Sequence, residues 1–245
     1  MRVNSLVVGV GEVGSAVKEV LSEVYEVYGL DLNTSITFDE CDYLNICIPY
    51  SDRFVDIVNE YVDRFKPKLT VIHSTIPIGT TKKIKGNVVH SPVRGRHPKI
   101  VEGLKRYIKY VGYNDFESNL LAGEYLDKVF STRFVQDSNV TEFMKLSSLA
   151  FYLVYLAVAD EINELSKKLG VSFGEVKNWI TTQNDEIDNF YTDMRWPVLD
   201  PPEGKVGGHC CLPVSEMLLG EAQDAGVDTK VILQAFKKYQ NLQVL

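Results

Sequence analysis

The chain has 245 residues, of which 45% are hydrophobic and 24% charged, as in an ordinary soluble globular protein. This length allows a full hydrophobic core and one or two domains. The formal net charge of −7 argues against nucleic acid or an anionic membrane as the main partner, although a local basic cluster can still bind an anionic small molecule. Four cysteines, two of them adjacent, form no disulfide framework, and the N-terminus enters a strand directly, so we expect a cytoplasmic protein.

Predicted strands alternate with predicted helices in the first half of the chain. Apolar and β-branched runs predict strands at Leu6–Val10, Val24–Leu30, Tyr43–Ile48, Leu69–His73, Asn87–His90 and Arg106–Gly112. Helical spacing predicts helices at Ser15–Ser22, Asp52–Phe65, Thr80–Ile84 and Phe116–Val129. This alternation is typical of an α/β fold with a Rossmann-type, doubly wound parallel sheet, which we assign to residues 1–135.

The remaining residues, 136–245, are predicted to form an all-helical domain dominated by one long helix. Asn139–Leu169 has no glycine or proline, would span roughly 45 Å, and would end at Gly170. Because apolar residues recur on nearly every face, we expect this helix to be buried in a domain core or a subunit interface. Its most apolar run, Leu146–Ala159, is too short to span a membrane. The other predicted helices are Phe173–Thr182, Asp185–Met194, Pro213–Ala225 and Val227–Leu242, with a main loop at Arg195–Gly208.

A glycine-rich turn, Gly9-x-Gly11-x-x-Gly14, follows the first strand and opens the first helix, and Asp31 ends the next strand. This context predicts a dinucleotide site, with a glycine-rich turn of another doubly wound protein as the alternative. Gly9 would make the turn, Gly11 would let the backbone approach the pyrophosphate, and Gly14 would allow close helix packing. Asp31 would accept hydrogen bonds from the ribose hydroxyls and repel a 2′-phosphate, which favours NAD over NADP.

A second motif, Val206–Val214, places His209, Cys210 and Cys211 directly after two glycines. A flexible turn followed by thiols is common where a cysteine meets a small molecule, although a buried cysteine is often only a small hydrophobic residue. We expect no metal site, because these three residues are too close in sequence to bind one ion together and no second cluster exists.

A polar stripe follows the long helix at spacings of three or four: Thr141, Lys145, Ser148, Tyr152 and Tyr155. Lys145 would either face a cleft between the domains or extend to solvent. A basic run, Arg94, Arg96, His97 and Lys99, follows the fifth strand and would either bind a phosphate or carboxylate or form a solvated loop.

Taken in order, these motifs resemble those of the UDP-glucose/GDP-mannose dehydrogenases. The matching segments are Gly9–Gly14, His73–Thr80, Ser91–Arg94, Glu142–Lys145 and Gly207–Val214. The resemblance covers the first two domains of the family, whereas the third domain, which binds the nucleotide of the substrate, has no counterpart. It implies oxidation of the primary alcohol of a nucleotide sugar to a carboxylate with two NAD, and a homodimer built on the long helix.

The resemblance also implies roles for individual residues. Thr75 would lie near the active-site water, Lys145 would stabilise the oxyanion, and Cys210 or Cys211 would form a thiohemiacetal and a thioester with the substrate. The candidate cofactor-binding residues are Gly9, Gly11, Glu12, Val13, Gly14, Asp31, Pro49, Ser74 and Thr75. The candidate substrate-binding residues are Arg94, Arg96, Ser148, Tyr152, Gly208 and His209.

Three positions depart from the family pattern. Val93 replaces a glutamate, Leu149 an asparagine that Ser148 could partly replace, and Ser215 an aspartate when counted from Cys211. These departures weaken the hydrolytic second half of the reaction most, so a single oxidation of an alcohol to a carbonyl is an alternative. A catalytically silent NAD-binding sensor is another alternative. A prephenate-type oxidative decarboxylase is a third, because His90-Ser-Pro is similar to a segment of prephenate dehydrogenases.

Overall fold

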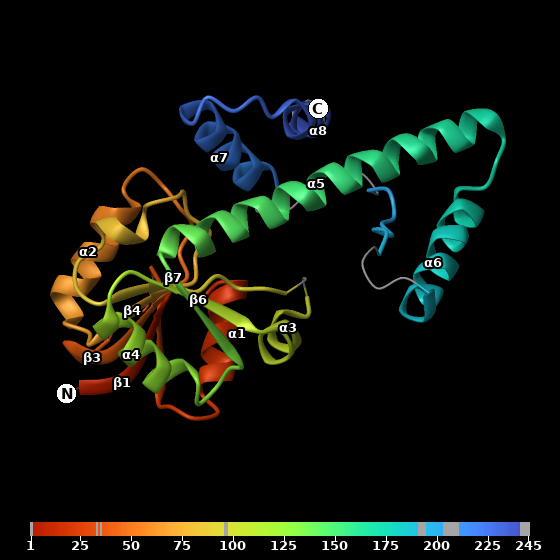
Figure 1. The fold of residues 1–245 in the computed structure, drawn as a ribbon. Coiled ribbons are helices and arrows are strands. Elements are labelled where there is room, and N and C mark those ends of the chain that lie inside the picture. The colour runs from red at the N-terminus through yellow and green to blue at the C-terminus, as the bar shows by residue number, and fades with distance from the viewer. Residues whose placement is uncertain are drawn as a thin grey trace. The chain divides into compact units, whose positions relative to one another are not determined.

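The computed structural model describes residues 2–32, 34, 36–95, 98–190, 195–202 and 211–240, with the backbone alone for residues 2, 3 and 188–190. The chain divides into two compact units, Met1–Leu146 and Ser147–Leu245. Helix α5 (Ser138–Leu169) begins in the first unit and continues into the second (Figure 1). The assignment of domains to residues 1–135 and 136–245 stays a prediction.

The first unit is built on a seven-stranded sheet with the order β2-β1-β3-β4-β5-β6-β7. All neighbouring strands are parallel except β5 and β6, which are antiparallel. The strand order reverses at β1, so the loops after β1 and β3 flank the position where doubly wound sheets bind ligands. The strands are β1 (Arg2–Val8), β2 (Val27–Leu30), β3 (Glu40–Ile46), β4 (Leu69–Ile72), β5 (Val88–His90), β6 (Lys109–Tyr113) and β7 (Thr132–Gln136).

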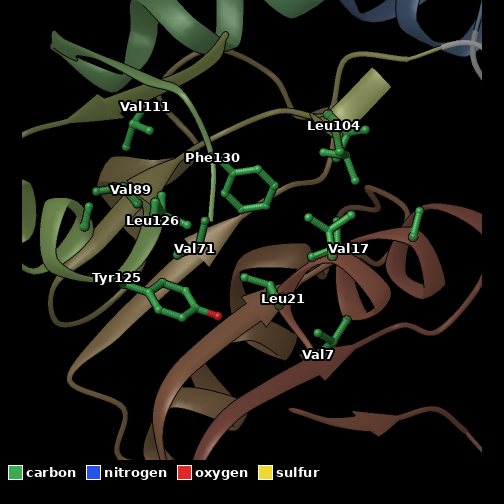
Figure 2. Packing of buried hydrophobic residues seen from close by; sticks show 14 of the residues in the cluster. Val7, Val17, Leu21, Val71, Val89, Leu104, Val111, Tyr125, Leu126 and Phe130 are labelled. Atoms are coloured by element: carbon green, nitrogen blue, oxygen red, sulfur yellow. The ribbon is translucent and has the colours of Figure 1, made fainter. Parts of the chain in front are cut away.

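Helices cover both faces of this sheet, because alternate strand residues point to opposite sides. One face, which carries Val7, Val71 and Val111, packs against α1 (Glu12–Leu21), α3 (Ile100–Arg106) and α4 (Phe116–Leu126) (Figure 2). The other face, which carries Leu6, Val8 and Ile46, packs against α2 (Phe54–Phe65). The predicted α/β fold class is confirmed.

Helix α3 and strand β7 of the first unit were not predicted, and the predicted strand β6 runs antiparallel to its neighbour β5. Helix α3 is a seven-residue helix interrupted by Gly103, at which a Cβ would lie 2.7 Å from the Gly95 Cα. Strand β7 is a short edge strand without a regular apolar pattern. Helix α3 occupies the residues up to Arg106, so the sixth strand begins at Lys109, and this strand runs antiparallel to β5. The predicted short helix at Thr80–Ile84 is a 3₁₀ turn, η1 (Thr81–Lys83).

The second unit is helical in its described residues, with α6 (Phe173–Phe190), α7 (Cys211–Asp224) and α8 (Lys230–Gln240) following α5. Helix α6 is continuous, where two helices were predicted, since no glycine or proline separates the two stretches. Gly170 has a φ of +68°, as expected for the glycine that ends α5. The core of this unit joins Leu153 and Leu156 of α5 to Cys211 of α7 and to Phe236 and Tyr239 of α8.

Helix α5 is only partly buried in the single chain, because one apolar stripe of this helix is open to solvent, and its expected burial in a domain core or a subunit interface stays a prediction. The six residues of this stripe have exposed fractions between 40% and 66%. Among the described residues, α5 is the one helix that is long and apolar enough, by length and composition, to cross a membrane. The sequence prediction considered only the shorter run Leu146–Ala159. Core helices of soluble proteins pass the same test. The stripe consists of Phe151, Tyr155, Val158, Ile162, Leu165 and Leu169.

Candidate functional site

The glycine-rich turn after β1 has the geometry that the three glycines were predicted to provide. Gly9 has a φ of +85°, and a Cβ there would lie 2.8 Å from the carbonyl oxygen of Cys47. A Cβ on Gly14 would lie only 1.8 Å from the carbonyl oxygen of Gly9, so the helix can approach the turn only without a side chain. A Cβ on Gly11 would meet nothing within 4 Å. The space beside Gly11 is therefore open to a ligand.

Asp31 lies directly beside this turn. Its Oδ2 accepts a hydrogen bond from the Val10 backbone N–H at 2.9 Å, and its Oδ1 accepts one from the Leu32 N–H at 2.8 Å. The carboxylate is exposed, so it can also accept bonds from a ligand. Since the peptide of Val10 belongs to the turn itself, Asp31 and the open side of Gly11 belong to one surface.

The N-terminus of α1 faces the same turn. Gly11 is the N-cap of α1 and has no side chain to accept a bond from the amides of the first turn, where Glu12 is exposed and Val13 half-buried. An uncapped helix N-terminus carries partial positive charge that favours a phosphate. The residues present therefore fit a dinucleotide with its pyrophosphate at this helix and its ribose at Asp31.

The loop after β4 is tied to the neighbouring loop after β3. The Ser74 hydroxyl donates to the carbonyl oxygen of Ile48 at 2.6 Å, next to the exposed Pro49. The backbone oxygen of Ser74 lies 3.1 Å from His90 Nε2. Thr75 follows and is half-buried. The structure thus places Pro49, Ser74 and Thr75 on adjacent loops at the carboxyl edge of the sheet, on the side where the glycine turn ends β1.

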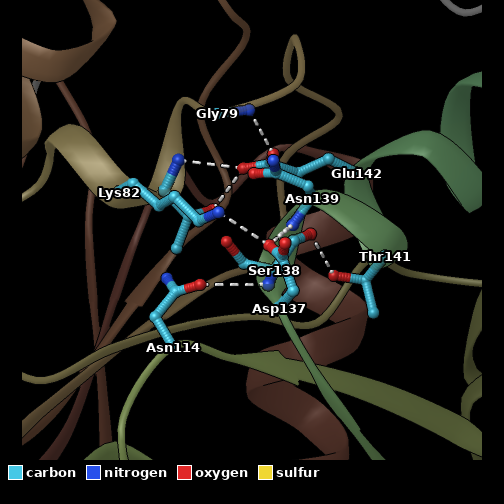
Figure 3. A network of polar contacts seen from close by, with 9 residues as sticks. Gly79, Lys82, Asn114, Asp137, Ser138, Asn139, Thr141 and Glu142 are labelled. Atoms are coloured by element: carbon cyan, nitrogen blue, oxygen red, sulfur yellow. Dashed lines mark hydrogen bonds and ion pairs between the residues drawn. The ribbon is translucent and has the colours of Figure 1, made fainter.

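The first turns of α5 bind these loops through polar side chains (Figure 3). Glu142 is fully buried, and its two carboxylate oxygens accept bonds from Gly79 and Thr81. The hydroxyl of Thr141 lies 2.9 Å from His90 Nδ1. One turn further along, Lys145 Nζ donates to the carbonyl oxygen of Val93 at 2.9 Å. Lys145 therefore does not simply extend to solvent.

A chain of buried polar side chains crosses the sheet near the same edge. Lys109 is 4% exposed, and its Nζ lies 2.9 Å from Ser91 O and 3.3 Å from His73 Nδ1. His73 Nε2 lies 3.1 Å from Asn45 Oδ1, and the Asn45 amide nitrogen donates onward to the Tyr125 hydroxyl at 2.9 Å. His73 Nδ1 also lies 3.0 Å from Ser91 O, so a neutral His73 donates either from Nδ1 to Ser91 O or from Nε2 to Asn45 Oδ1, according to its tautomer.

Burial shifts the pKa values of the ionisable groups in this region toward the neutral forms. Desolvation, with help from the charge on Lys145, lowers the pKa of Lys109 to about 7. Desolvation raises the pKa of the nearby Cys47 thiol to about 12 and lowers the pKa of His90 to about 3. His73 also has a pKa well below its usual value, mainly because it is buried. Both histidines are therefore neutral at physiological pH.

In the second unit, Cys211 is the first residue of α7 and is a free thiol. Its side chain is 6% exposed and packs in the apolar core of this unit. Ser215, one turn later on the same face, is fully buried, and its hydroxyl has no hydrogen-bond partner within the described ranges. The predicted site residues Arg96, Gly208, His209 and Cys210 lie outside the described residues.

The remaining predicted substrate-binding residues are exposed. The guanidinium of Arg94 lies over the rings of Tyr107 and Tyr110, with its Cζ 5.0 and 6.0 Å from their centroids. Ser148 and Tyr152 lie on α5 in the second unit and are open to solvent. In the part of the chain that the structure describes, no three histidine, cysteine or acidic side chains gather in a way that could hold a metal ion.

Two residues of this region received no role from the sequence. Glu142 begins the family-like segment Glu142–Lys145, so its position three residues before Lys145 could have indicated a role at the site. Lys109 gave no signal, because the neighbouring Ile108 is the residue that an apolar pattern places inside. The structure has the reverse arrangement, with Ile108 46% exposed and Lys109 buried.

No family model matches the sequence. Curated relatives named UDP-N-acetyl-D-mannosamine dehydrogenase do match. The protein of Methanococcus maripaludis is 30% identical over an alignment of 201 positions that covers 74% of this chain and 44% of the relative. The protein of Methanococcus aeolicus is 26% identical over an alignment of 254 positions, gaps included, that covers 97% of this chain and 52% of the relative. The chain thus spans about half the length of the curated relatives it matches.

Solved structures share the fold. The UDP-D-ManNAc dehydrogenase of Pyrococcus horikoshii aligns with a TM-score of 0.77 at 20% identity, covering 99% of this chain and 69% of that one. The UDP-glucose dehydrogenase of Pyrobaculum islandicum gives 0.74 at 17% identity, with 97% and 68% covered. A 3-hydroxyisobutyrate dehydrogenase of Mycobacterium tuberculosis gives 0.72 at 17% identity, with 98% and 94% covered.

Fold and turn geometry define a doubly wound α/β protein with a glycine-rich turn at its switch point and a helical second unit. The sequence relatives, together with this fold, confirm the predicted resemblance to the UDP-glucose/GDP-mannose dehydrogenase family.

Proposed function

We propose that the chain is an NAD-dependent oxidoreductase that oxidises a CH–OH group of a sugar nucleotide. The observation that carries this proposal is the open, uncapped glycine turn with Asp31 hydrogen-bonded to its Val10 peptide. When bound, NAD supplies the hydride acceptor. The names of the curated relatives favour this activity over a silent sensor or a prephenate-type decarboxylase.

Gly9, Gly11, Glu12, Val13 and Gly14 would hold the pyrophosphate at the N-terminus of α1, and the carboxylate of Asp31 would bind the ribose. A 2′-phosphate would bring two more negative charges close to Asp31, so the site favours NAD. Pro49, Ser74 and Thr75, on the two neighbouring loops, would line the path of the cofactor along the carboxyl edge of the sheet.

The chemical step would use Lys145 and a cysteine of the Cys210–Cys211 pair. The thiolate would attack the aldehyde carbon, the C–S bond would form, and the carbonyl π electrons would move to oxygen. The Lys145 ammonium would stabilise that oxyanion by charge. Either thiol is a candidate for the nucleophile: Cys211 begins α7, whose N-terminus stabilises negative charge, whereas its burial in an apolar core opposes ionisation of the thiol. Arg94, together with Arg96 and His209, would bind the anionic part of the substrate.

The first test is NADH formation by the whole chain with UDP-N-acetylmannosamine and UDP-glucose, alongside Cys211→Ala and Cys210→Ala. The proposal expects turnover that one of these two changes abolishes, and loss in Cys211→Ala alone would assign the nucleophile to Cys211. Loss of turnover in Cys210→Ala alone would instead assign the nucleophile to Cys210. NAD binding without any NADH would support the sensor and contradict the proposal.

A second candidate, a single oxidation that stops at the carbonyl, has a specific observation in its favour. The buried Ser215 hydroxyl replaces the family aspartate one turn from Cys211, and the apolar Val93 replaces the family glutamate, so the groups that assist hydrolysis are missing. The number of NADH formed per substrate separates the two. Two NADH with a carboxylate product indicate the full reaction, whereas one NADH with a carbonyl product indicates the single oxidation.

We also propose that a second copy of the chain covers the apolar stripe of α5. Its six residues are spaced by 4, 3, 4, 3 and 4 positions, which is the heptad pattern of a helix that packs along another helix. A two-fold axis lets the same stripe cover itself. Mass determination by light scattering should give a dimer, and Ile162→Glu should give a monomer. Lys167→Glu, outside the stripe, is the control; detergent-dependent solubility in place of a dimer would indicate a membrane-bound helix.

A further inference from the structure

Glu142 is a fully buried carboxylate whose hydrogen bonds all run to a loop distant in sequence. Its Oε2 accepts from the Gly79 N–H at 2.6 Å. Its Oε1 accepts from the Thr81 N–H at 2.9 Å and from the Thr81 hydroxyl at 2.6 Å. Because a buried carboxylate is costly unless hydrogen-bonded, these three donors explain why the charge is tolerated in this place.

The start of α5 is capped by other residues. Asp137 accepts a bond from the Asn139 N–H at 2.9 Å, and the Ser138 N–H donates to Asn114 at 3.1 Å (Figure 3). The basic side chain of Lys82 forms an ion pair with Asp137, with its Nζ 2.9 Å from Asp137 Oδ1. The helix therefore has its own N-terminal partners, and the bonds of Glu142 fix the loop.

The loop that Glu142 holds contains Thr75 and is anchored at both ends. At its start, Ser74 is bound to Ile48, and its backbone oxygen faces His90, which in turn contacts Thr141 of α5. At its end, Gly79, with a φ of +80°, and Thr81 are bound to Glu142. Thr75 thus lies between two links to the same helical turn.

Lys145 lies three residues after Glu142 on the same helix, so both side chains lie on one face of α5. Its Nζ is itself fixed by the carbonyl oxygen of Val93. Because Lys145 and Glu142 belong to the same rigid helix turn, and Glu142 anchors the Thr75 loop, this turn sets the distance between Lys145 and Thr75.

We propose that Glu142 is a positioning residue that holds the Thr75 loop in register with Lys145 for the oxidation. This inference rests on the proposed function, because Thr75 and Lys145 act together only if the chain is a dehydrogenase. A change of Glu142 should therefore lower kcat by a larger factor than it lowers the affinity for NAD, because most of the proposed cofactor contacts lie at the glycine turn and only part of them on the Thr75 loop.

The experiment compares Glu142→Gln with a matched control, Asp115→Asn. Asp115 is also a carboxylate that accepts from a backbone N–H and a hydroxyl, both of Ser118, but it caps α4. We expect Glu142→Gln to lower kcat by about 10- to 100-fold while the NAD Kd rises by less than about 3-fold, and Asp115→Asn to change kcat by less than about 2-fold. Both variants are measured at a temperature where melting curves show them folded.

A double-mutant cycle then tests the link to Thr75. If Glu142 acts through Thr75, the variant with Thr75→Ala and Glu142→Gln should lose little more than Thr75→Ala alone. Fully additive losses, or an unchanged kcat in Glu142→Gln, would overturn the proposal while the wild-type turnover still supports the dehydrogenase.

Hydrogen exchange provides a readout that needs no turnover. In Glu142→Gln, the amides of residues 78–81 should exchange at least about 10-fold faster, whereas those of the first turns of α5 stay protected. Equal deprotection of the start of α5 would show that Glu142 merely stabilises the helix and would overturn the inference. An inactive wild type with the expected exchange would count against the proposed activity and leave the anchoring of the loop supported.

Discussion

Lys109 and Lys145 donate to carbonyl oxygens only two residues apart, Ser91 O and Val93 O, each at 2.9 Å. One lysine comes from the sheet and the other from α5, so the segment after β5 is held from two elements. A fixed segment here matters because its Val93 carbonyl oxygen holds Lys145, the lysine for which we propose oxyanion stabilisation.

Replacing Lys145 should therefore affect the reaction more than the fold. We expect Lys145→Met to lower kcat by about 100-fold or more, since one charged donor to an oxyanion is worth about that much. Steady-state kinetics measures this loss, with Lys85→Met, an exposed lysine paired with Asp63, as the control. A kcat within about 3-fold of the wild type would assign Lys145 a purely structural role.

The two neighbouring glycines of the turn should respond differently to alanine. In Gly14→Ala the new Cβ meets the Gly9 carbonyl oxygen, so we expect a loss of more than about 2 kcal/mol in the free energy of unfolding. In Gly11→Ala the Cβ enters open space, so stability should change by less than about 1 kcal/mol while the NAD affinity falls about 10-fold. Urea unfolding and calorimetric titration check both values. Unchanged NAD affinity in Gly11→Ala would place the cofactor elsewhere.

Asp31 should control the choice between NAD and NADP. Asp31→Asn keeps an oxygen that can accept from the Val10 N–H but removes the charge that repels a 2′-phosphate. The Kd for NAD should rise about 10-fold, and the preference for NAD over NADP should shrink by a larger factor. Titration with both nucleotides tests this. An identical preference in Asp31→Asn and in the exposed control Asp52→Asn would contradict the assigned ribose contact.

The buried lysine gives a pH dependence of stability with a definite sign. The folded protein holds Lys109 at a pKa of about 7, below its ordinary value of 10.5, so between these values the unfolded chain binds more protons. The loss of folding stability that comes from burying protonated Lys109 is complete below about pH 7. As the pH rises, the free energy of unfolding recovers by at most about 1.4 kcal/mol per pH unit. Cys47, His73, His90 and Lys145 are titratable groups that interact with it.

The variant Lys109→Met isolates this contribution. The difference in unfolding free energy, wild type minus variant, should increase from about pH 7 to about pH 9 in urea titrations. A difference that stays constant over this range would show that Lys109 keeps its ordinary pKa in the fold.

The sequence predicted what depends on local pattern. The three glycines of the turn and the carboxylate of Asp31 are dictated by backbone geometry over a few residues, and the structure places them as expected. Two features needed the tertiary fold. Lys109 is inside because the antiparallel β6 turns it toward His73, against the pattern set by Ile108. Glu142 has its role because a loop 61 residues earlier folds onto α5.

The most direct measurement is NADH formation by the whole chain, incubated with NAD and, in separate reactions, UDP-N-acetylmannosamine, UDP-glucose, small 2- and 3-hydroxy acids, and prephenate. The proposed function predicts NADH with a sugar nucleotide, and loss of that signal in Lys145→Met at unchanged NAD binding. NAD binding in calorimetry with no NADH from any sugar nucleotide would contradict it.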